Sequence, residues 1–378
     1  MMIDAPRARF ERLASAMKRR FVERDALVDA ALAALVAGEH LLVIGPPGTA
    51  KSQLAAALCD AITGARGFEW LLTRFTTPEE LFGPVSLRAL EDDRYERLVA
   101  GKLPDAHVVF LDEVFKASSA ILNALLTVLN ERRFHNGARA LDIPLVTLIA
   151  ASNELPDEDA LQALYDRFLV RVMVDYVEED HRFARLLTLP APTALPAIGL
   201  AEVEAARAAA AALPVEAQVI RDLTALRREL RGHGVVASDR RWRQALGFMR
   251  AWAWLRGRAA VSEAELGALR HVLWSDPDER DAVQAALDAV LGEESARLQT
   301  LVFEARAFAG LPEAEDEDER ARAALEARVK LEQIRAEGQA LLDAARRRGR
   351  RTEALAEMLA EIDGLRETVR RALGSALQ

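Results

Sequence analysis

The chain has 378 residues, of which 51% are hydrophobic and 29% charged, a length and balance that indicate two or three folded domains and exclude wholesale disorder. Its 50 Lys and Arg against 59 Asp and Glu give a net charge of -9, which lends no support to general electrostatic binding of nucleic acid. A single cysteine, Cys59, excludes an intrachain disulfide, and the scattered histidines give no zinc signature. Because the sequence has no apolar run typical of a signal peptide or a membrane span, we expect a cytoplasmic protein with no membrane span.

The first half of the chain alternates predicted helices with short apolar strands. Apolar residues at spacings of three and four predict one or two amphipathic helices over residues 8–37, and the continuous apolar run at 40–44 predicts a strand covered on both faces. Further strands are predicted at 108–111 and 145–149, on either side of a helix over 119–131. This alternation predicts an α/β fold with a doubly wound parallel sheet.

Two hairpins and a helical second half complete the predicted elements. Residues 85–99 are predicted to form two short strands around a polar turn, and residues 133–143 a second hairpin with an Asn-Gly turn. Helical patterns then fill residues 200–275. Three long helices follow, and the apolar stripe of the last is typical of a bundle; they are predicted at 278–309, 317–347 and 352–375.

A loop rich in glycine and proline links the strand at 40–44 to a helix predicted from Lys51 to about Ile62. Its sequence is Gly45-Pro46-Pro47-Gly48-Thr49-Ala50-Lys51-Ser52. Such a loop can cradle phosphate oxygens with its backbone N–H groups, while the lysine reaches the β- and γ-phosphates and the serine binds Mg²⁺. The usual motif has glycine where this chain has Ala50, so we expect a backbone there that a Cβ tolerates. The loop predicts a site for ATP or ADP with Mg²⁺, the alternative being an ordinary Gly-Pro turn.

Polar side chains end two of the other predicted strands. Asp112 and Glu113 follow the strand at 108–111, at the edge of the sheet where open α/β sheets bind ligands. Asp112 is placed to hold Mg²⁺ through water, Glu113 to polarise the attacking water, and Asn153 to orient that water. Taken singly, these residues are a strand-end acidic cap and a turn asparagine. Beside the loop, they predict a site for phosphoryl transfer.

With these motifs the chain resembles the AAA+ ATPases, and among them the MoxR family, most closely its RavA branch. Besides the loop, the resemblance rests on Thr73-Arg-Phe-Thr-Thr-Pro-Glu-Glu-Leu-Phe-Gly-Pro84, Phe110-Leu-Asp-Glu-Val-Phe-Lys-Ala117, Asn123-Ala-Leu-Leu-Thr-Val-Leu-Asn-Glu131, Ala151-Ser-Asn-Glu-Leu-Pro156 and Leu164-Tyr-Asp-Arg-Phe168. It covers about residues 20–275. The β-rich partner-binding module that interrupts the terminal bundle of the RavA branch has no counterpart in this sequence.

The resemblance implies roles for several arginines. The arginine of the Asp-Arg-Phe element completes a neighbouring subunit's site in this family, which makes Arg167 the expected arginine finger and Arg171 its alternative. Arg240 matches the second sensor, which contacts the nucleotide phosphates, and the adjacent Arg241 is the alternative for that role.

The resemblance also implies an assembly and a function. We expect a hexameric ring with ATP sites between subunits, a hairpin inserted at about 85–99, and Phe21 and Val22 at the adenine pocket, although core packing explains these two nearly as well. The expected function is Mg²⁺-dependent ATP hydrolysis that drives chaperone-like remodelling of a protein client, with a partner that bears a von Willebrand factor A domain. The expected domains are an AAA+ α/β nucleotide-binding domain at 1–192, an all-α lid at 193–276 and a C-terminal three-helix bundle or hairpin at 277–378.

Three other functions stay open. A metal-insertion ATPase subunit resembling magnesium chelatase shares the hairpin insertion, although that family lacks the helical tail predicted here. A nucleic-acid motor is disfavoured by the acidic charge balance. A nucleotide-gated scaffold that hydrolyses ATP poorly would share the whole site.

Overall fold

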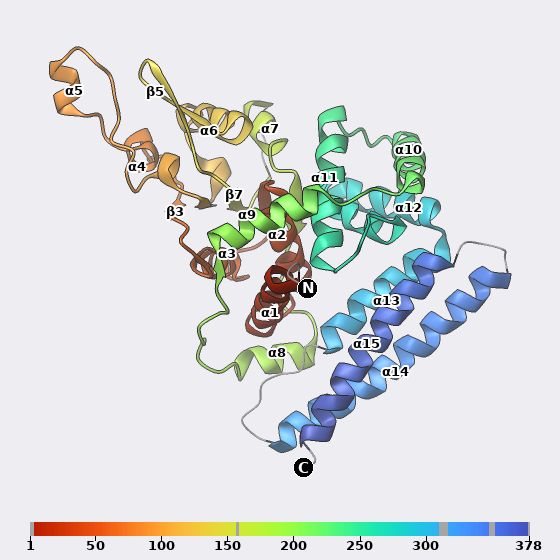
Figure 1. Cartoon of the computed structure of the whole chain (residues 1–378). Coiled ribbons are helices and arrows are strands. Elements are labelled where there is room, and N and C mark those ends of the chain that lie inside the picture. Colours follow the sequence, from red (N-terminus) through yellow and green to blue (C-terminus); the bar gives the residue numbers. More distant parts are fainter. Residues whose placement is uncertain (1–3, 156–158, 310–316, 348–351, 377–378) are drawn as a thin grey trace. The chain divides into compact units, whose positions relative to one another are not determined.

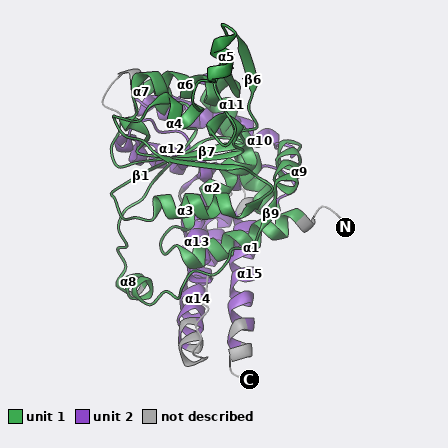
Figure 2. Cartoon of the chain, turned by 90° about the vertical axis from the view of Figure 1, so that its left-hand side faces the viewer, with its two compact units in different colours: residues 1–212, 240–257 green, residues 213–239, 258–378 purple. Residues whose placement is uncertain are grey.

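A computed structural model of the chain describes residues 4–155, 159–309, 317–347 and 352–376. The chain divides into two compact units (Figure 2): residues 1–212 with 240–257 form the first unit, and residues 213–239 with 258–378 form the second. The chain thus leaves the first unit, returns to it for one helix and leaves it again. The expected boundaries at residues 192 and 276 stay predictions.

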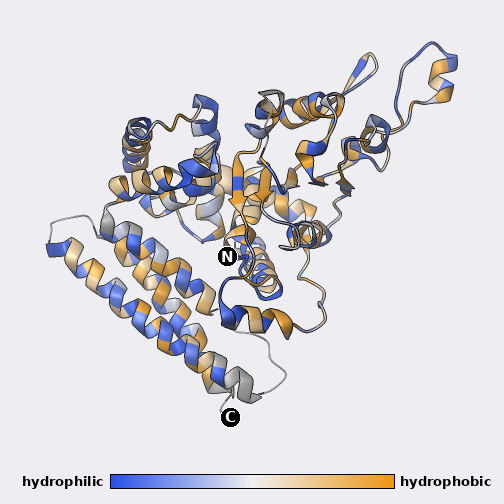
Figure 3. Ribbon diagram, turned by 180° about the vertical axis from the view of Figure 1, so that it is seen from behind, coloured by the Kyte–Doolittle hydropathy of each residue, from blue (hydrophilic) through white to orange (hydrophobic). Residues whose placement is uncertain are grey.

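A five-stranded parallel sheet forms the core of the first unit. Its order is β3-β4-β7-β1-β8, and the strands are β1 (Leu41–Ile44), β3 (Gly67–Leu71), β4 (Val108–Asp112), β7 (Thr147–Ser152) and β8 (Val170–Met173). β1 and β7 are buried along their whole length, and most of the sheet is hydrophobic (Figure 3). Because Ile44 pairs with Ser152 and Ala150 with Leu111, the carboxyl ends of β1, β7 and β4 meet at one edge. The predicted parallel α/β sheet is confirmed.

Helices surround this sheet (Figure 1), and α2 and α3 pack on its strands. A second, two-stranded parallel pair joins β2 (Ile62–Thr63) to β9 (Ile198–Gly199). The α-helices of the first unit are α1 (Asp4–Arg20), α2 (Asp25–Ala37), α3 (Lys51–Asp60), α4 (Pro78–Phe82), α5 (Leu87–Glu91), α6 (Ser119–Glu131), α7 (Asp159–Tyr165), α8 (Asp180–Leu187), α9 (Leu200–Ala211) and α11 (Asp239–Leu255). Short 3-10 turns occur at Leu103–Asp105 and Val114–Lys116.

Two segments of the first unit project from the sheet (Figure 1). The hairpin of β5 (Arg133–Asn136) and β6 (Arg139–Asp142) confirms the one predicted at 133–143. In the insert at 85–99 the two predicted strands are replaced by a single antiparallel bridge around helix α5. The reason is local: the Ser86 hydroxyl caps the helix by accepting from the N–H of Ala89, and leucine, arginine and alanine favour a helical turn there.

The second unit is helical. Its elements are α10 (Ala217–Gly232), the 3-10 helices Glu263–His271 and Pro277–Glu279, α12 (Arg280–Leu291), α13 (Glu293–Ala309), α14 (Glu317–Arg347) and α15 (Glu353–Ala376). The last three lie side by side as the predicted bundle (Figure 1), around a core of buried leucine, isoleucine and methionine. The single helix expected at 278–309 is instead two, because Gly292, with φ 82° and ψ 150°, ends α12. Within the described ranges, every helix is too short or too polar to cross a bilayer.

Candidate nucleotide-binding site

The phosphate loop lies between β1 and α3, and two of its residues fix its shape. Gly45 has φ 156°, and a Cβ there would lie 2.0 Å from the carbonyl oxygen of Val174, just beyond β8. The Thr49 hydroxyl donates a 2.9 Å hydrogen bond to the carbonyl of Pro46. Only glycine can stand at the first position, because any side chain would collide with the backbone of Val174.

Ala50 corrects an expectation about this loop. It has φ 65° and ψ 21° immediately before α3, which is the left-handed region. The expectation that the backbone there suits a Cβ is therefore wrong, since an L-residue in this region costs about 1 to 2 kcal/mol. The loop must turn sharply to start α3, and surrounding contacts hold the alanine where the usual motif has glycine.

Lys51 folds back over the loop. Its Nζ donates hydrogen bonds to the carbonyls of Gly45 (2.6 Å) and Pro46 (2.8 Å) and to Oδ1 of Asn153 (2.8 Å). The side chain is buried, and burial lowers the pKa of its ammonium although two nearby carboxylates oppose that shift. A positive charge is thus held above the loop by neutral oxygens that an anion could replace.

A chain of hydrogen bonds joins the ends of β4 and β7 to the start of α3. The Ser52 hydroxyl donates to Oδ2 of Asp112 (2.7 Å), and the backbone N–H of Glu113 donates to Oδ1 of the same carboxylate (3.0 Å). Nδ2 of Asn153 donates to Oε1 of Glu113, whose Oε2 makes a 3.2 Å ion pair with Lys116. The amide of Asn153 therefore connects Lys51 to the carboxylate of Glu113, the residue after β4.

The oxygens of Ser52 and Asp112 fit the ligand preference of Mg²⁺. This ion takes oxygen ligands, keeps several waters and is usually bound through one or two protein groups together with substrate phosphates. Across the part of the chain that the structure describes, no three His, Cys, Asp or Glu side chains cluster into an all-protein metal site. The structure thus brings the two predicted ligands together in a form that suits a phosphate-bound cation.

Arg24 is a part of this site that the sequence does not reveal. Its Nε donates to the Thr49 carbonyl (3.1 Å) and its Nη2 to the Asp175 carbonyl (2.5 Å), and burial lowers its pKa. No motif marks this arginine, because its partners are backbone atoms distant in sequence. Phe21 and Val22, in the same turn, are each 5% exposed; their place at an adenine pocket stays a prediction.

Two of the four predicted arginines are structural. Arg241 is 3% exposed and donates to the carbonyl of Leu169 (3.1 Å) and to the backbone and carboxylate of Asp166. Arg171 is 1% exposed, with its guanidinium 3.9 Å from the ring centroid of Tyr165. Contacts within this chain bury both side chains, and the alternatives that assign the sensor to Arg241 and the finger to Arg171 stay predictions.

The other two arginines lie close together at the surface of the first unit. Arg167 makes a 3.7 Å ion pair with Asp166, and its side chain is 24% exposed, with Nε buried and donating to no described residue. Burial lowers its pKa, and the charge of the exposed Arg240 lowers it further. Two positive charges that repel each other at one surface are suited to an anion supplied from outside the subunit.

Glu39, in the turn before β1, contacts α11, the helix that carries Arg240. Its Oε2 accepts a 2.8 Å hydrogen bond from Nε2 of Gln244 on α11. Burial raises its pKa to about 7, against the opposing charges of Arg132 and Arg240. The carboxyl is therefore a group beside Arg240 that titrates near neutral pH.

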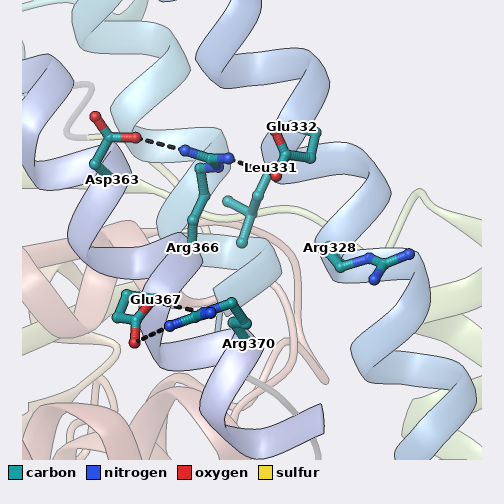
Figure 4. A pocket seen from close by; sticks show the side chains of 7 residues that line it. All are labelled: Arg328, Leu331, Glu332, Asp363, Arg366, Glu367 and Arg370. Carbon is teal, nitrogen blue, oxygen red and sulfur yellow. Dashed lines mark hydrogen bonds and ion pairs between the residues drawn. The ribbon is translucent and has the colours of Figure 1, made fainter. Parts of the chain in front are cut away.

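A surface hollow of about 220 Å³ in the second unit is a separate feature (Figure 4). Its charges satisfy each other: Arg366 donates to Asp363 and Glu332, and Arg370 donates to Glu367. Arg328 lines the hollow as well, and the two paired arginines attract a further anion only weakly because carboxylates already neutralise them.

Replacing Ala50 with glycine is expected to stabilise the folded protein slightly. Glycine adopts φ 65° without the conformational cost that alanine has there. The greater freedom of glycine in the unfolded chain offsets part of this gain, so we expect the free energy of unfolding to rise by about 0 to 1 kcal/mol. Ala56→Gly, inside helix α3, is the matched control and should lose about 1 kcal/mol. Urea unfolding checks both, and similar losses for the two variants would contradict the conformation of Ala50.

Replacing Glu39 with glutamine is expected to flatten the pH dependence of stability. A carboxyl whose pKa rises from 4.5 to about 7 on folding binds its proton more tightly in the native state, so its contribution falls as the pH rises through 7. The free energies of unfolding measured at about pH 5.5 and about pH 8 should differ by about 2 kcal/mol less in the variant than in the wild type. Glu131→Gln, at an exposed position on α6, should leave the difference unchanged; identical behaviour of the two variants contradicts the assignment.

Comparison with known proteins agrees with this geometry. Residues 8–190 match a family model described as the MoxR domain in the MoxR-vWA-beta-propeller ternary systems, and residues 218–287 match an AAA lid domain. An uncharacterized protein of Methanocaldococcus jannaschii is 42% identical over 274 residues, which are 71% of this chain and 72% of that protein. The chaperone MoxR1 of Mycobacterium tuberculosis is 28% identical over 170 residues, 44% of each chain.

A solved structure shows the same fold. The crystal structure of a candidate ATPase from Cytophaga hutchinsonii superposes with a TM-score of 0.61 at 15% identity, over 76% of this chain and 94% of that one. The matching family model describes ternary systems, and assignment to a RavA-like branch stays a prediction. The MoxR match over the α/β core, the AAA lid match and the 42% identical relative together show that the chain belongs to the MoxR family of AAA+ ATPases.

Proposed function

We propose that the chain is a Mg²⁺-dependent ATPase that works as an oligomeric, chaperone-like remodelling motor. The observation that carries the hydrolytic part is the bridge that Asn153 makes between Lys51 and Glu113, beside the pair of Ser52 and Asp112. Each strand end supplies one part of a phosphoryl-transfer site: β1 the phosphate loop, β4 the carboxylates and β7 the amide.

Lys51 is the group proposed to bind the β- and γ-phosphates. Its ammonium is bonded to carbonyl oxygens of the loop, and phosphate oxygens would make stronger, charge-assisted bonds in their place. The backbone N–H groups of the loop and the positive end of α3 add to this attraction. Ser52 and Asp112 are proposed to hold Mg²⁺, which when bound neutralises charge on the phosphate oxygens.

Glu113 is the proposed base for the attacking water. Its carboxylate is held by Asn153 and Lys116, so it must exchange one of these partners for water before it can accept a proton. When Lys51 turns to phosphate, Oδ1 of Asn153 is released and can accept from that water. Asn153 would thus report that a phosphate is bound by orienting the water only then.

Glu113→Gln should abolish turnover while ATP binding persists. The glutamine keeps the shape and the contact with Asn153 but cannot take a proton, so we expect a loss of at least about 100-fold in phosphate release. Binding of a fluorescent ATP analogue should stay close to that of the wild type. Glu154→Gln, at an exposed position after β7, is the control for charge. Turnover by the Glu113 variant at the wild-type rate would contradict the proposed base.

Arg167, helped by Arg240, is proposed to complete the site of a neighbouring subunit in a hexameric ring. The support is their shared surface and mutual repulsion, which a phosphate from outside would relieve. A site divided between subunits also makes turnover per chain rise with protein concentration.

Mixing two inactive variants tests this division. The Glu113→Gln subunit retains Arg167, and the Arg167→Ala subunit retains Glu113. An interface is complete when the Arg167→Ala subunit supplies the loop and Glu113 while the Glu113→Gln subunit supplies Arg167. In a ring mixed at random from equal amounts, about a quarter of the interfaces have that arrangement, and a comparable fraction of wild-type phosphate release should return. A mixture as inactive as its components would place Arg167 outside any neighbour's site.

The insert at 85–99 is the proposed contact with a protein client. Large apolar side chains exposed to solvent gather in and near it, which suits unfolded or apolar protein segments; they are Leu71, Phe75, Leu87, Leu90, Tyr95 and Leu98. The side chain of Asn136, in the β5–β6 hairpin, bonds both backbone groups of Arg97 and so couples the two projections.

Partner and location belong to the same proposal. The matching family model describes MoxR domains that act with vWA proteins, and this supports a partner with a von Willebrand factor A domain. The relative named a chaperone supports the remodelling role. A reducing cytoplasm suits Cys59, whose pKa is raised to about 12 by burial, so that its thiol is inert.

A further inference from the structure

We infer that Arg24 is a positioning residue that clamps the phosphate loop in the conformation that binds nucleotide. The inference rests on the proposed function, because nucleotide binding is its readout. It assigns a role to a residue that the mechanism above does not use.

Arg24 is fully engaged with backbone carbonyls. Nε donates to Thr49 (3.1 Å), Nη1 to Glu23 (2.9 Å) and Nη2 to Asp175 (2.5 Å), and the residue is 6% exposed. Each of its three nitrogens is therefore used within the protein. Its contact with the site is the carbonyl of Thr49, so its effect on the site passes through the loop.

The contact falls at the strained point of the loop. The Thr49 carbonyl belongs to the peptide that enters Ala50, the residue in the left-handed region. The Thr49 hydroxyl braces the loop from inside by bonding Pro46, whereas Arg24 braces it from outside. Without the outer brace, the peptide could rotate and Ala50 could relax to an ordinary conformation, which would turn loop N–H groups away from phosphate.

The turn that carries Arg24 is itself fixed. Glu23 has φ 56°, and its carboxylate accepts hydrogen bonds from the backbone N–H groups of Glu178 (3.1 Å) and Glu179 (3.2 Å) at the start of α8. Arg24 is thus anchored at two points outside the loop, its own turn and the segment after β8. A guanidinium fork can reach all three carbonyls at once, whereas the single nitrogen of a lysine cannot.

Burial of this arginine calls for such a role. A guanidinium removed from water loses favourable hydration, and a leucine or methionine would fill the same space at lower cost. The nearby carboxylates of Glu23 and Asp175 soften that penalty. What an apolar residue cannot do is hold the Thr49 carbonyl in place.

The test is a double-mutant cycle between Arg24 and Ala50 in the full-length chain. Binding of a fluorescent ATP analogue with Mg²⁺ is measured for wild type, Arg24→Lys, Ala50→Gly and the double variant. Arg24→Lys should weaken binding about tenfold, since the strain of Ala50 is then no longer held. In the Ala50→Gly background the same change should cost less than about twofold, because glycine adopts the turn without a clamp.

Arg185→Lys is the matched control. Arg185 donates from Nη2 to the Arg19 carbonyl (2.9 Å) and is partly buried, but it has no hydrogen bond to the loop. Its replacement should leave nucleotide affinity unchanged. A loss as large as that of Arg24→Lys would mean that the effect is a general consequence of removing a buried arginine.

Each remaining outcome decides the inference. If Arg24→Lys binds like the wild type, or loses the same factor in both backgrounds, the clamp does not exist. If Arg24→Lys fails to fold but the double variant folds and binds, the clamp is supported; if both fail, Arg24 is a general core residue and the inference is overturned. A wild-type chain that binds no nucleotide refutes the proposed function itself, which is a different result from any of these.

Discussion

The hydrogen bonds of the Asn153 amide hold two opposite charges at the edge of the sheet, and the site depends on them. Lys51 and Glu113 belong to different elements, and both are largely removed from water. Burying either charge alone is costly, so each needs a partner with the correct polarity. The Asn153 amide supplies both partners, because its oxygen accepts from the Lys51 ammonium and its nitrogen donates to the Glu113 carboxylate. This requires β1, β4 and β7 to be neighbours in register, which the hydrophobic strands ensure.

The sequence predicts those parts of the site that depend on local pattern. Apolar runs identify β1, β4 and β7, and the polar residues that end them must converge because the strands are parallel. The role of Arg24 could not be predicted in this way, because its hydrogen-bond partners are backbone carbonyls, which every residue has. The helical turn of α5 could not be predicted in this way either. Val85 forms a bridge, as a strand residue would, whereas Ser86 caps a helix, and only the cap depends on neighbouring residues alone.

Left-handed backbone marks the places where tertiary contacts override local preference. Glu23, Ala50, Asp93, Glu113 and Arg132 have positive φ in the first unit, and each lies in a turn or next to the end of an element. For Arg132 the holding contacts are hydrogen bonds to the carbonyls of Gly38 (2.6 Å) and Leu145 (3.0 Å). Such conformations persist only where the surroundings fix them. Two of them, Ala50 and Glu113, belong to the candidate site, so tertiary contacts fix the backbone at these two site residues.

Helix α11 connects this preset site to the rest of the chain. Arg241 ties it to the turn around Asp166, and Gln244 ties it to Glu39, while Arg240 is left exposed beside Arg167. The chain on both sides of the helix belongs to the second unit. Two hydrogen-bonded anchors therefore fix α11 within the first unit, next to the exposed Arg240. The anchor at Glu39 has a pKa raised to about 7, so protonation there changes the charge beside Arg240 near neutral pH.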